Sequence, residues 1–441
     1  MTRVLSIELR RSAALGATAV LLLAGAALLF AAPTRWVSSG MALVMAQREY
    51  LVLLWPLALA AGAWQGRREH RSKVGELFSS TPRPPAQRVL PTAAALAVAA
   101  VTGYLLMTAV GAAWMAGTAR YLPAQAFVVL TVGLVAIVGG VWLGLAVGRL
   151  LPYLVTAPLL AVAGIGLLMT IGAVRGAPEW LAYVLSPMYG MSLYTDWQTV
   201  GGRTSAAQAI WLTALAIAAL VLLMAGSWRT RLTALLPAAL GAALAIAVIP
   251  HGDDFVPHPI DPVAQEFVCT NDAPAVCVTR VRAGLLDDFA PLARQTLGAL
   301  AKLPDPPTTV REDTTTYQPL TLAPQPPGVI LADLYTNARG KLIGQLPTQF
   351  GMMQSAFSTG ERCEQPGNPA VERAAIFYLL GEKPLPDSEI YAGVVYGDDE
   401  TNPEAVKLWE GLRQRPEQDA LARVAAVRRA SLACEPTDGL L

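Results

Sequence analysis

Seven long stretches of the chain carry no Asp, Glu, Lys or Arg, and apolar residues dominate each of them. A helix needs about 17 to 25 such residues to cross the hydrocarbon core of a membrane. The stretches cover residues 12–34, 50–66, 89–119, 121–148, 150–174, 204–228 and 232–252. Buried helices of a large soluble protein are a weak alternative, because short basic loops separate the stretches. The pattern therefore predicts about seven transmembrane helices, and the length of the first favours an uncleaved span over a signal peptide.

A different pattern follows residue 251, where the hydrophobic runs shorten and proline becomes frequent. Strand-like runs and helical periods are mixed there, which predicts a separate globular domain. The expected strands cover 266–270, 275–281 and 328–333, and the expected helices cover 284–302, 369–381, 403–413 and 416–433. The predicted fold is an all-α polytopic membrane protein with a small α+β extracellular domain. Its expected parts are a six-helix domain over 1–231, a seventh membrane helix over 232–252, and the extracellular domain over 253–441.

Charge divides the chain at the same place. The whole chain has 33 Lys and Arg against 32 Asp and Glu, whereas residues 1–250 have 17 against 6 and residues 251–441 have 16 against 26. The membrane part is therefore basic, at +11, and the rest is acidic, at −10. No basic stripe lies outside the loops that flank the membrane, which argues against a nucleic-acid partner.

The basic residues in the loops predict the orientation, because the side richer in Lys and Arg is cytoplasmic. With the N-terminus inside, the inner segments hold twelve basic residues and the outer loops hold five. The inner set is Arg3, Arg10, Arg11, Arg67, Arg68, Arg71, Lys73, Arg83, Arg88, Arg149, Arg229 and Arg231, and the outer set is Arg35, Arg48, Arg120, Arg175 and Arg203. We therefore expect a multi-pass protein of the plasma membrane with its C-terminal domain outside the cell.

All four cysteines lie in the predicted extracellular domain, and disulfides persist outside the cytoplasm. Two disulfides among Cys269, Cys277, Cys363 and Cys434 allow three pairings. We favour Cys269 with Cys277, which closes a short loop, and Cys363 with Cys434, which ties the last helix back to the domain. A zinc site is a weaker alternative, because these cysteines lack paired ligand spacings.

Motifs for nucleotide hydrolysis and hydrolytic catalysis are missing from the sequence. The nearest approach to a phosphate-binding loop, NARGKLIG, has Leu342 where a hydroxyl group would bind magnesium. His251 and His258 flank two aspartates and could ligate a cation, but a proline-containing linker is poorly suited to convergent ligands. We therefore expect no enzyme activity, no metal and no cofactor in this chain.

Ionisable residues are nearly absent from the predicted spans, so no proton relay is indicated. The exception is Arg48 and Glu49, at the outer end of the second span. These two residues have two interpretations: an ion pair at the membrane rim, or a contact with substrate at an outward-facing gate.

Two loops contain patterns of their own. Residues 65–90 predict a charged helix ending near Ser79, with Val74, Leu77 and Phe78 on one face. Either inner-leaflet lipid or a cytoplasmic partner protein would cover that face. Residues 175–203 carry aromatic side chains typical of membrane interfaces and predict either two short outer-leaflet helices broken at Ser186–Pro187 or an ordered outer loop. The opening residues 1–12 have two interpretations: a short amphipathic segment on the inner leaflet, or a frayed basic tail.

Three features of the sequence resemble the permease subunit of a type-2 ABC exporter, of the kind found in many actinobacterial export systems. They are the amphipathic start, the second span with the loop that follows it (LLWPLALAAGAWQGRREHRSKVGELFSSTPRP), and YVLSPMYG before the sixth span. The resemblance covers about residues 1–228. It implies that the loop after the second span forms a coupling helix on a separate cytoplasmic ABC ATPase, and that two permeases pair as a homodimer or heterodimer. The coupling residues that it implies are Arg71, Val74, Glu76, Leu77 and Phe78.

The chain departs from that family by its seventh span and its extracellular domain. The expected function is ATP-driven export of a hydrophobic or peptide-like cargo, with membrane lipids and the ATPase as partners. The alternative is a membrane receptor or regulatory protein whose outer domain binds a ligand or a component of the cell envelope. A membrane-tethered enzyme is least favoured, because the motifs are missing.

Overall fold

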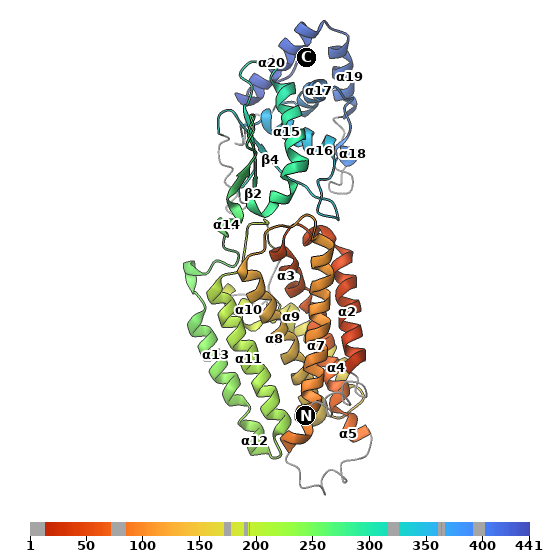
Figure 1. Cartoon of the computed structure of the whole chain (residues 1–441), viewed down its shortest axis with the longest axis vertical. Coiled ribbons are helices and arrows are strands. Elements are labelled where there is room, and N and C mark those ends of the chain that lie inside the picture. Colours follow the sequence, from red (N-terminus) through yellow and green to blue (C-terminus); the bar gives the residue numbers. More distant parts are fainter. Residues whose placement is uncertain are drawn as a thin grey trace. The chain divides into compact units, whose positions relative to one another are not determined.

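The chain divides into two compact units (Figure 1). The membrane unit comprises Met1–Ala116 and Leu122–Asp261, and the C-terminal unit comprises Gly117–Tyr121 and Pro262–Leu441. The computed structural model describes residues 14–71, 85–171, 178–188, 193, 195–315, 326–359, 363, 367–390 and 402–441. The expected amphipathic segment at residues 1–12 lies outside the described residues.

Each of the seven charge-free stretches coincides largely with one long helix of the membrane unit. These helices are α2 (Ala14–Ala31), α4 (Leu51–Gly66), α7 (Pro85–Met115), α8 (Ala124–Leu150), α9 (Thr156–Ile171), α11 (Gly202–Met224) and α13 (Leu235–Val248). Shorter helices connect them: η1 (Pro33–Arg35), α3 (Gly40–Glu49), α5 (Arg68–Arg71), α10 (Glu179–Leu185), α12 (Trp228–Leu232) and η2 (Gly252–Asp254). Helices α7, α8 and α11 extend past their charge-free stretches to include Arg88, Arg149 and Arg203.

By length and composition, four described helical segments can each cross a membrane, namely Ala86–Met115, Ala124–Leu150, Gly202–Met224 and Trp228–Val248, the last of which joins α12 and α13. A fifth candidate is the pair α3 and α4, which is bent by 52° at Tyr50. The apolar helices Gly16–Ala31 and Thr156–Ile171 are shorter. The chain is thus a membrane protein with transmembrane helices.

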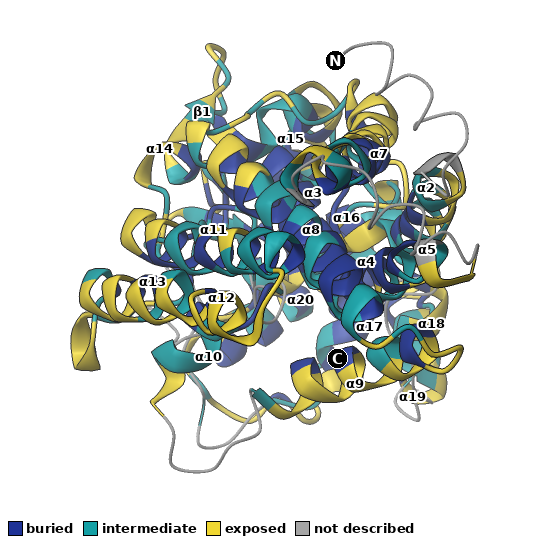
Figure 2. Cartoon of the chain, turned by 90° about the horizontal axis from the view of Figure 1, so that it is seen from below, coloured by how far each residue is buried: buried dark blue, intermediate teal, exposed yellow. Residues whose placement is uncertain are grey.

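Helix α8 lies at the centre of the membrane unit and packs against α3, α4, α7 and α11. Seen along the helices, α4 and α8 are largely buried whereas α12 and α13 are largely exposed (Figure 2). The exposed leucines of α13, such as Leu240 and Leu244, suit a helix that faces lipid.

Glycines bring the backbones of α4 and α8 into direct contact. A Cβ atom on Gly144 of α8 would lie 2.0 Å from the carbonyl oxygen of Leu59, and one on Gly62 of α4 would lie 2.1 Å from that of Val141. Cβ atoms on Gly66 and Gly148 would also meet the backbone of the opposite helix, at 2.4 and 2.3 Å from a carbonyl oxygen, and Gly140 makes room for the Trp55 side chain, which a Cβ atom there would meet at 2.7 Å. Small residues four apart allow helices in a membrane to approach to backbone contact, where dispersion attraction holds them. The sequence carries this spacing twice, at Gly62 and Gly66 and at Gly140, Gly144 and Gly148.

The C-terminal unit is an α+β domain built on a four-stranded sheet of order β1-β2-β3-β4. Its strands are β1 (Phe267–Cys269), β2 (Val276–Thr279), β3 (Thr309–Glu312) and β4 (Val329–Ala332); β1 pairs antiparallel with β2, and the other pairs are parallel. Its helices are α14 (Pro262–Gln265), η3 (Arg280–Leu285), α15 (Leu286–Leu300), α16 (Gln345–Ala356), α17 (Pro369–Leu380), α18 (Asp387–Ile390), α19 (Asn402–Arg413) and α20 (Glu417–Leu432).

One hydrophobic core holds this domain together, with Phe289, Phe350 and Phe377 buried in it beside Val276 and Val310. Three of the strands and four of the helices coincide with expected elements. The sequence did not indicate β3 and α16. The structure contains the disulfides Cys269–Cys277, between register partners of β1 and β2, and Cys363–Cys434, which is the pairing that we favoured.

Replacing Gly144 by alanine tests the backbone contact between α4 and α8. We expect Gly144→Ala to destabilise the protein by about 1–3 kcal/mol, because the new methyl group has no room beside Leu59. The midpoint of thermal unfolding of the full chain in detergent, followed by tryptophan fluorescence, measures the effect. Gly166→Ala is the matched control, because a Cβ atom there meets nothing within 4 Å. Equal midpoints for the two variants would contradict the contact.

Candidate functional site

A buried polar cluster lies beside the break between α3 and α4. Ser39 caps the N-terminus of α3 by accepting a hydrogen bond from the Ala42 N–H at 3.0 Å. From Gly40 to Arg48 every residue of α3 is buried, including Gln47 and Arg48. Charged side chains inside membrane proteins are costly and usually have a function. This cluster is therefore the candidate site of the membrane unit.

Arg48 is 1% exposed, and its guanidinium group links α3 to α11 and to the segment after α10. It donates to the carbonyl oxygen of Pro187 at 2.8 Å and to Oε1 of Gln208 at 3.1 Å. Gln208 in turn donates to the carbonyl oxygen of Tyr183, in α10. Gln208 of α11 thus meets a carbonyl group in the last turn of α10, and Arg48 of α3 meets one two residues beyond that helix. A cation is favoured at that end of a helix, because the carbonyl groups there carry partial negative charge.

Glu49 occupies a different environment from its neighbour. Its carboxylate accepts two hydrogen bonds from the Arg35 guanidinium group, at 2.9 and 3.0 Å, at the exposed surface. Arg35 therefore supplies the ion pair at the rim, while Arg48 points into the protein. Neither sequence interpretation of Arg48 and Glu49 anticipated that Arg48 would donate to Pro187 and Gln208.

Two further contacts shape the cluster around Arg48. Gln47 donates to the Thr108 hydroxyl oxygen at 3.0 Å, which joins α3 to α7. Gly133 of α8 leaves space for two larger side chains: a Cβ atom there would lie 2.5 Å from the Tyr104 hydroxyl oxygen and 3.1 Å from Cδ of Arg48. The cluster is consequently filled by protein side chains from α3, α7 and α11, packed against Gly133 of α8.

The segment that follows α13 folds back over α10. The His251 ring lies 4.7 Å from that of Trp180, and the Phe255 ring lies 5.3 Å from that of Tyr183. Backbone hydrogen bonds from Thr199 to Pro259 and from Asp261 to Trp197, both 2.8 Å, hold the segment in place. Residues 251–261, here called the strap, thus connect α13 to Pro262 across the aromatic helix α10.

His258 of the strap is 8% exposed and packs with its ring edge against Tyr183, at 6.4 Å between centroids. Burial lowers the pKa of His258, because the charged imidazolium form loses hydration. His251 and His258 therefore contact aromatic rings. Among the described residues no group of three or more His, Cys, Asp or Glu side chains is placed to hold a metal ion.

At the opposite end of the membrane unit, α4 runs into α5. Arg71 ends α5 and is exposed, and its guanidinium group lies 5.7 Å from the ring centroid of Trp64. The other expected coupling residues, Val74, Glu76, Leu77 and Phe78, lie outside the described residues, as do Tyr189 and Tyr194 of the aromatic loop.

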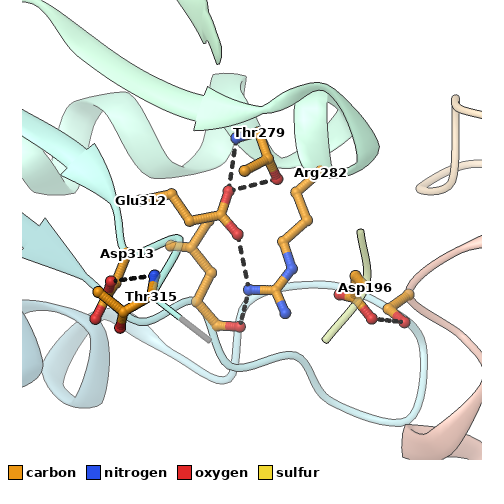
Figure 3. A network of polar contacts seen from close by, with 8 residues as sticks. Asp196, Thr279, Arg282, Glu312, Asp313 and Thr315 are labelled. Carbon is orange, nitrogen blue, oxygen red and sulfur yellow. Dashed lines mark hydrogen bonds and ion pairs between the residues drawn. The ribbon is translucent and has the colours of Figure 1, made fainter. Parts of the chain in front are cut away.

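In the C-terminal unit the most buried charge is Glu312, at the end of β3 (Figure 3). Its Oε2 atom accepts from the N–H and the hydroxyl group of Thr279, at 2.6 and 2.8 Å, and its Oε1 atom lies 3.2 Å from Nη1 of Arg282. Arg282 also donates to the carbonyl oxygen of Leu334 at 2.8 Å. These contacts pair the buried carboxylate with a cation and join β2, η3 and β3, so the network stabilises the sheet.

No family model, no curated protein and no solved structure matches the chain.

Replacing Arg48 by methionine tests its structural role. Arg48→Met leaves the carbonyl oxygen of Pro187 and Oε1 of Gln208 without this donor, so we expect a loss of about 1.5–3 kcal/mol of stability. Arg35→Met removes the exposed pair with Glu49 and should cost about 0–1 kcal/mol. Thermal unfolding of both variants in detergent gives the comparison. A smaller effect at Arg48 than at Arg35 would contradict the burial argument.

The strap should weaken in acid because of His258. The folded protein holds this imidazole neutral, so the unfolded chain binds more protons, and stability is lost as the pH falls below about 6.5. We expect His258→Gln to lose less thermal stability than the unmodified chain on acidification. His251→Gln is the control, since that ring is exposed. Parallel pH profiles of the unmodified chain and His258→Gln would refute the prediction.

Proposed function

We propose that the chain is the membrane-spanning permease subunit of an ATP-driven export system. Nucleotide would be hydrolysed by a separate cytoplasmic ATPase, and the cargo would be a hydrophobic or peptide-like molecule. Two copies of the chain, or one copy with a related permease, would pair with two ATPase subunits. The proposal rests on the resemblance of residues 1–228 to type-2 ABC exporter permeases and on the arrangement of the helices around α4.

The proposed topology has seven spans, with the N-terminus in the cytoplasm and the C-terminal unit outside. Two features support this orientation. Seven described arginines lie at the α5 and α12 end of the membrane unit, against three at the α3 and α10 end. The end with more arginines comprises Arg67, Arg68, Arg71, Arg88, Arg149, Arg229 and Arg231. Both disulfides lie in the C-terminal unit, which follows α13, and disulfides persist outside the cytoplasm.

The observation that carries the proposal is a continuous mechanical path through the membrane unit. The path starts at α5, where an ATPase would push, and continues along α4. The glycine contacts make α4 and α8 one body, so that both helices would move together. Beyond the break at Tyr50, Arg48 connects α3 to Pro187, two residues past the end of α10, and to Gln208 of α11. A displacement at the α5 end would thus reach the opposite end of the bundle, as a rocking movement between inward and outward states requires.

A receptor or regulatory protein is the second candidate, and one feature of the C-terminal unit favours it. A hollow of about 370 Å³ exists in the membrane unit, and another of about 340 Å³ exists in the C-terminal unit. The latter is lined by prolines, by the Ser355 and Thr359 side chains, and by Arg428, whose Nη1 donates to the carbonyl oxygen of Pro304 at 2.9 Å. If the chain is a receptor, deleting the C-terminal unit should abolish its function and should cause no defect in export.

We expect the reading frame adjacent to the gene of this chain to encode an ABC ATPase, and the proposed coupling is tested with that protein. The chain should co-purify with that ATPase and stimulate its activity. Replacing both Leu77 and Phe78 by aspartate should abolish the stimulation, because the apolar face of the coupling segment is lost. Leu232→Asp, on α12 at the same end of the bundle, is the matched control and should leave stimulation intact. Unchanged ATPase activity in the double variant would remove the support for the proposal.

A further inference from the structure

An apolar groove opens between α2, α4 and α9, at the end of the membrane unit that contains α5. It has a volume of about 370 Å³, and its wall is almost entirely apolar. Small residues make the groove: among the lining residues are Gly16, Ala17, Ala60, Ala61 and Pro158. An apolar hollow of this kind between membrane helices accepts hydrocarbon, because no polar group inside it requires a partner.

A tryptophan and two arginines stand at one end of the groove. Trp64 lines the groove and is 44% exposed. The guanidinium groups of Arg67 and Arg71 lie 5.2 and 5.7 Å from the centre of its ring. The hollow thus has an aromatic side chain and two positive charges at a single end, in the way that interfacial residues mark the boundary between hydrocarbon and headgroups.

Of the two arginines, Arg67 lies nearer to the ring of Trp64. Its Nε and Nη1 atoms are buried, and neither has a hydrogen-bond acceptor within the part of the chain that the structure describes. A buried N–H group without an acceptor is costly, and on a cation the cost is greater. An anionic headgroup beside this guanidinium group would balance its positive charge.

We propose that this groove binds one anionic glycerophospholipid. An acyl chain lies between α2, α4 and α9, the phosphate group accepts from Arg67, and Arg71 adds a second positive charge. The membrane around the helices supplies this amphiphile. Its phosphodiester offers the oxygen acceptors that guanidinium groups bind best. A second copy of the chain could cover the apolar wall, but an apolar helix would leave the Arg67 donors without an acceptor.

Lipid retention by the purified full chain tests the proposal without any ATPase, so the result is independent of the proposed export function. The chain is exchanged into detergent with equal amounts of phosphatidylglycerol and phosphatidylcholine, and bound lipid is counted by native mass spectrometry. We expect retention of phosphatidylglycerol over phosphatidylcholine, and a loss of that preference of about fivefold in Arg67→Gln. Inorganic phosphate should not displace the lipid, because it lacks the acyl chain.

Two further variants separate this site from general effects. Arg229→Gln is the matched charge control: Arg229 also stacks on a tryptophan, Trp228 at 5.7 Å, but neither residue lines the groove. Its preference should equal that of the unmodified chain. Gly16→Leu should reduce retention of both lipids, because its side chain extends into the groove while its Cβ atom meets no atom within 4 Å.

Three results would overturn the proposal. The first is equal retention of the two lipids by the unmodified chain. The second is an equal loss of preference in Arg67→Gln and Arg229→Gln, which would indicate net charge rather than a site. The third is a disulfide-linked dimer formed in high yield by Ala17→Cys in native membranes, since that would place a second copy in the groove.

Discussion

The contact between the backbones of α4 and α8 is the constraint on which the membrane unit depends. Apolar side chains gain little by leaving lipid for a helix surface, so helices in a membrane hold together through close approach and dispersion. Glycines such as Gly62 and Gly144 permit that approach. Because α8 also packs against α7 and α11, the position of the central pair determines where the other helices lie. Any movement of α4 therefore involves α8.

Buried charge is handled in the same way in both units. Arg48 donates to a backbone carbonyl group and a glutamine, and Glu312 accepts from a backbone N–H group and a hydroxyl group before it meets Arg282. Each charge joins elements distant in sequence and is held chiefly by groups whose positions the fold determines. A buried charge held in this way selects one arrangement of its elements, because any other arrangement would leave it without hydrogen bonds.

The sequence predicted the helices of the membrane unit well, because lipid gives backbone groups no partner and long apolar stretches must then be helical. It did not indicate β3, because one of the two buried positions of that strand is Glu312, and a charged residue there hides the alternation of apolar and polar residues. The role of Arg48 depends on Gln208 and Pro187, more than a hundred residues away, so no local pattern could reveal it. The glycine spacing of α4 and α8, by contrast, was visible in the sequence.

Helix α4 presents two different faces, and their spacing explains how it could be both rigid and adaptable. Leu59, Gly62 and Gly66 face α8, where backbone contact leaves no room for movement. Leu57, Ala60, Ala61 and Trp64, which follow the helical spacing of three and four residues, line the groove instead. On that side α2 is held mainly by α7. A force applied at α5 would therefore move α4 and α8 together and change the width of the groove. Binding of a ligand in the groove and movement of the pair would then be thermodynamically linked.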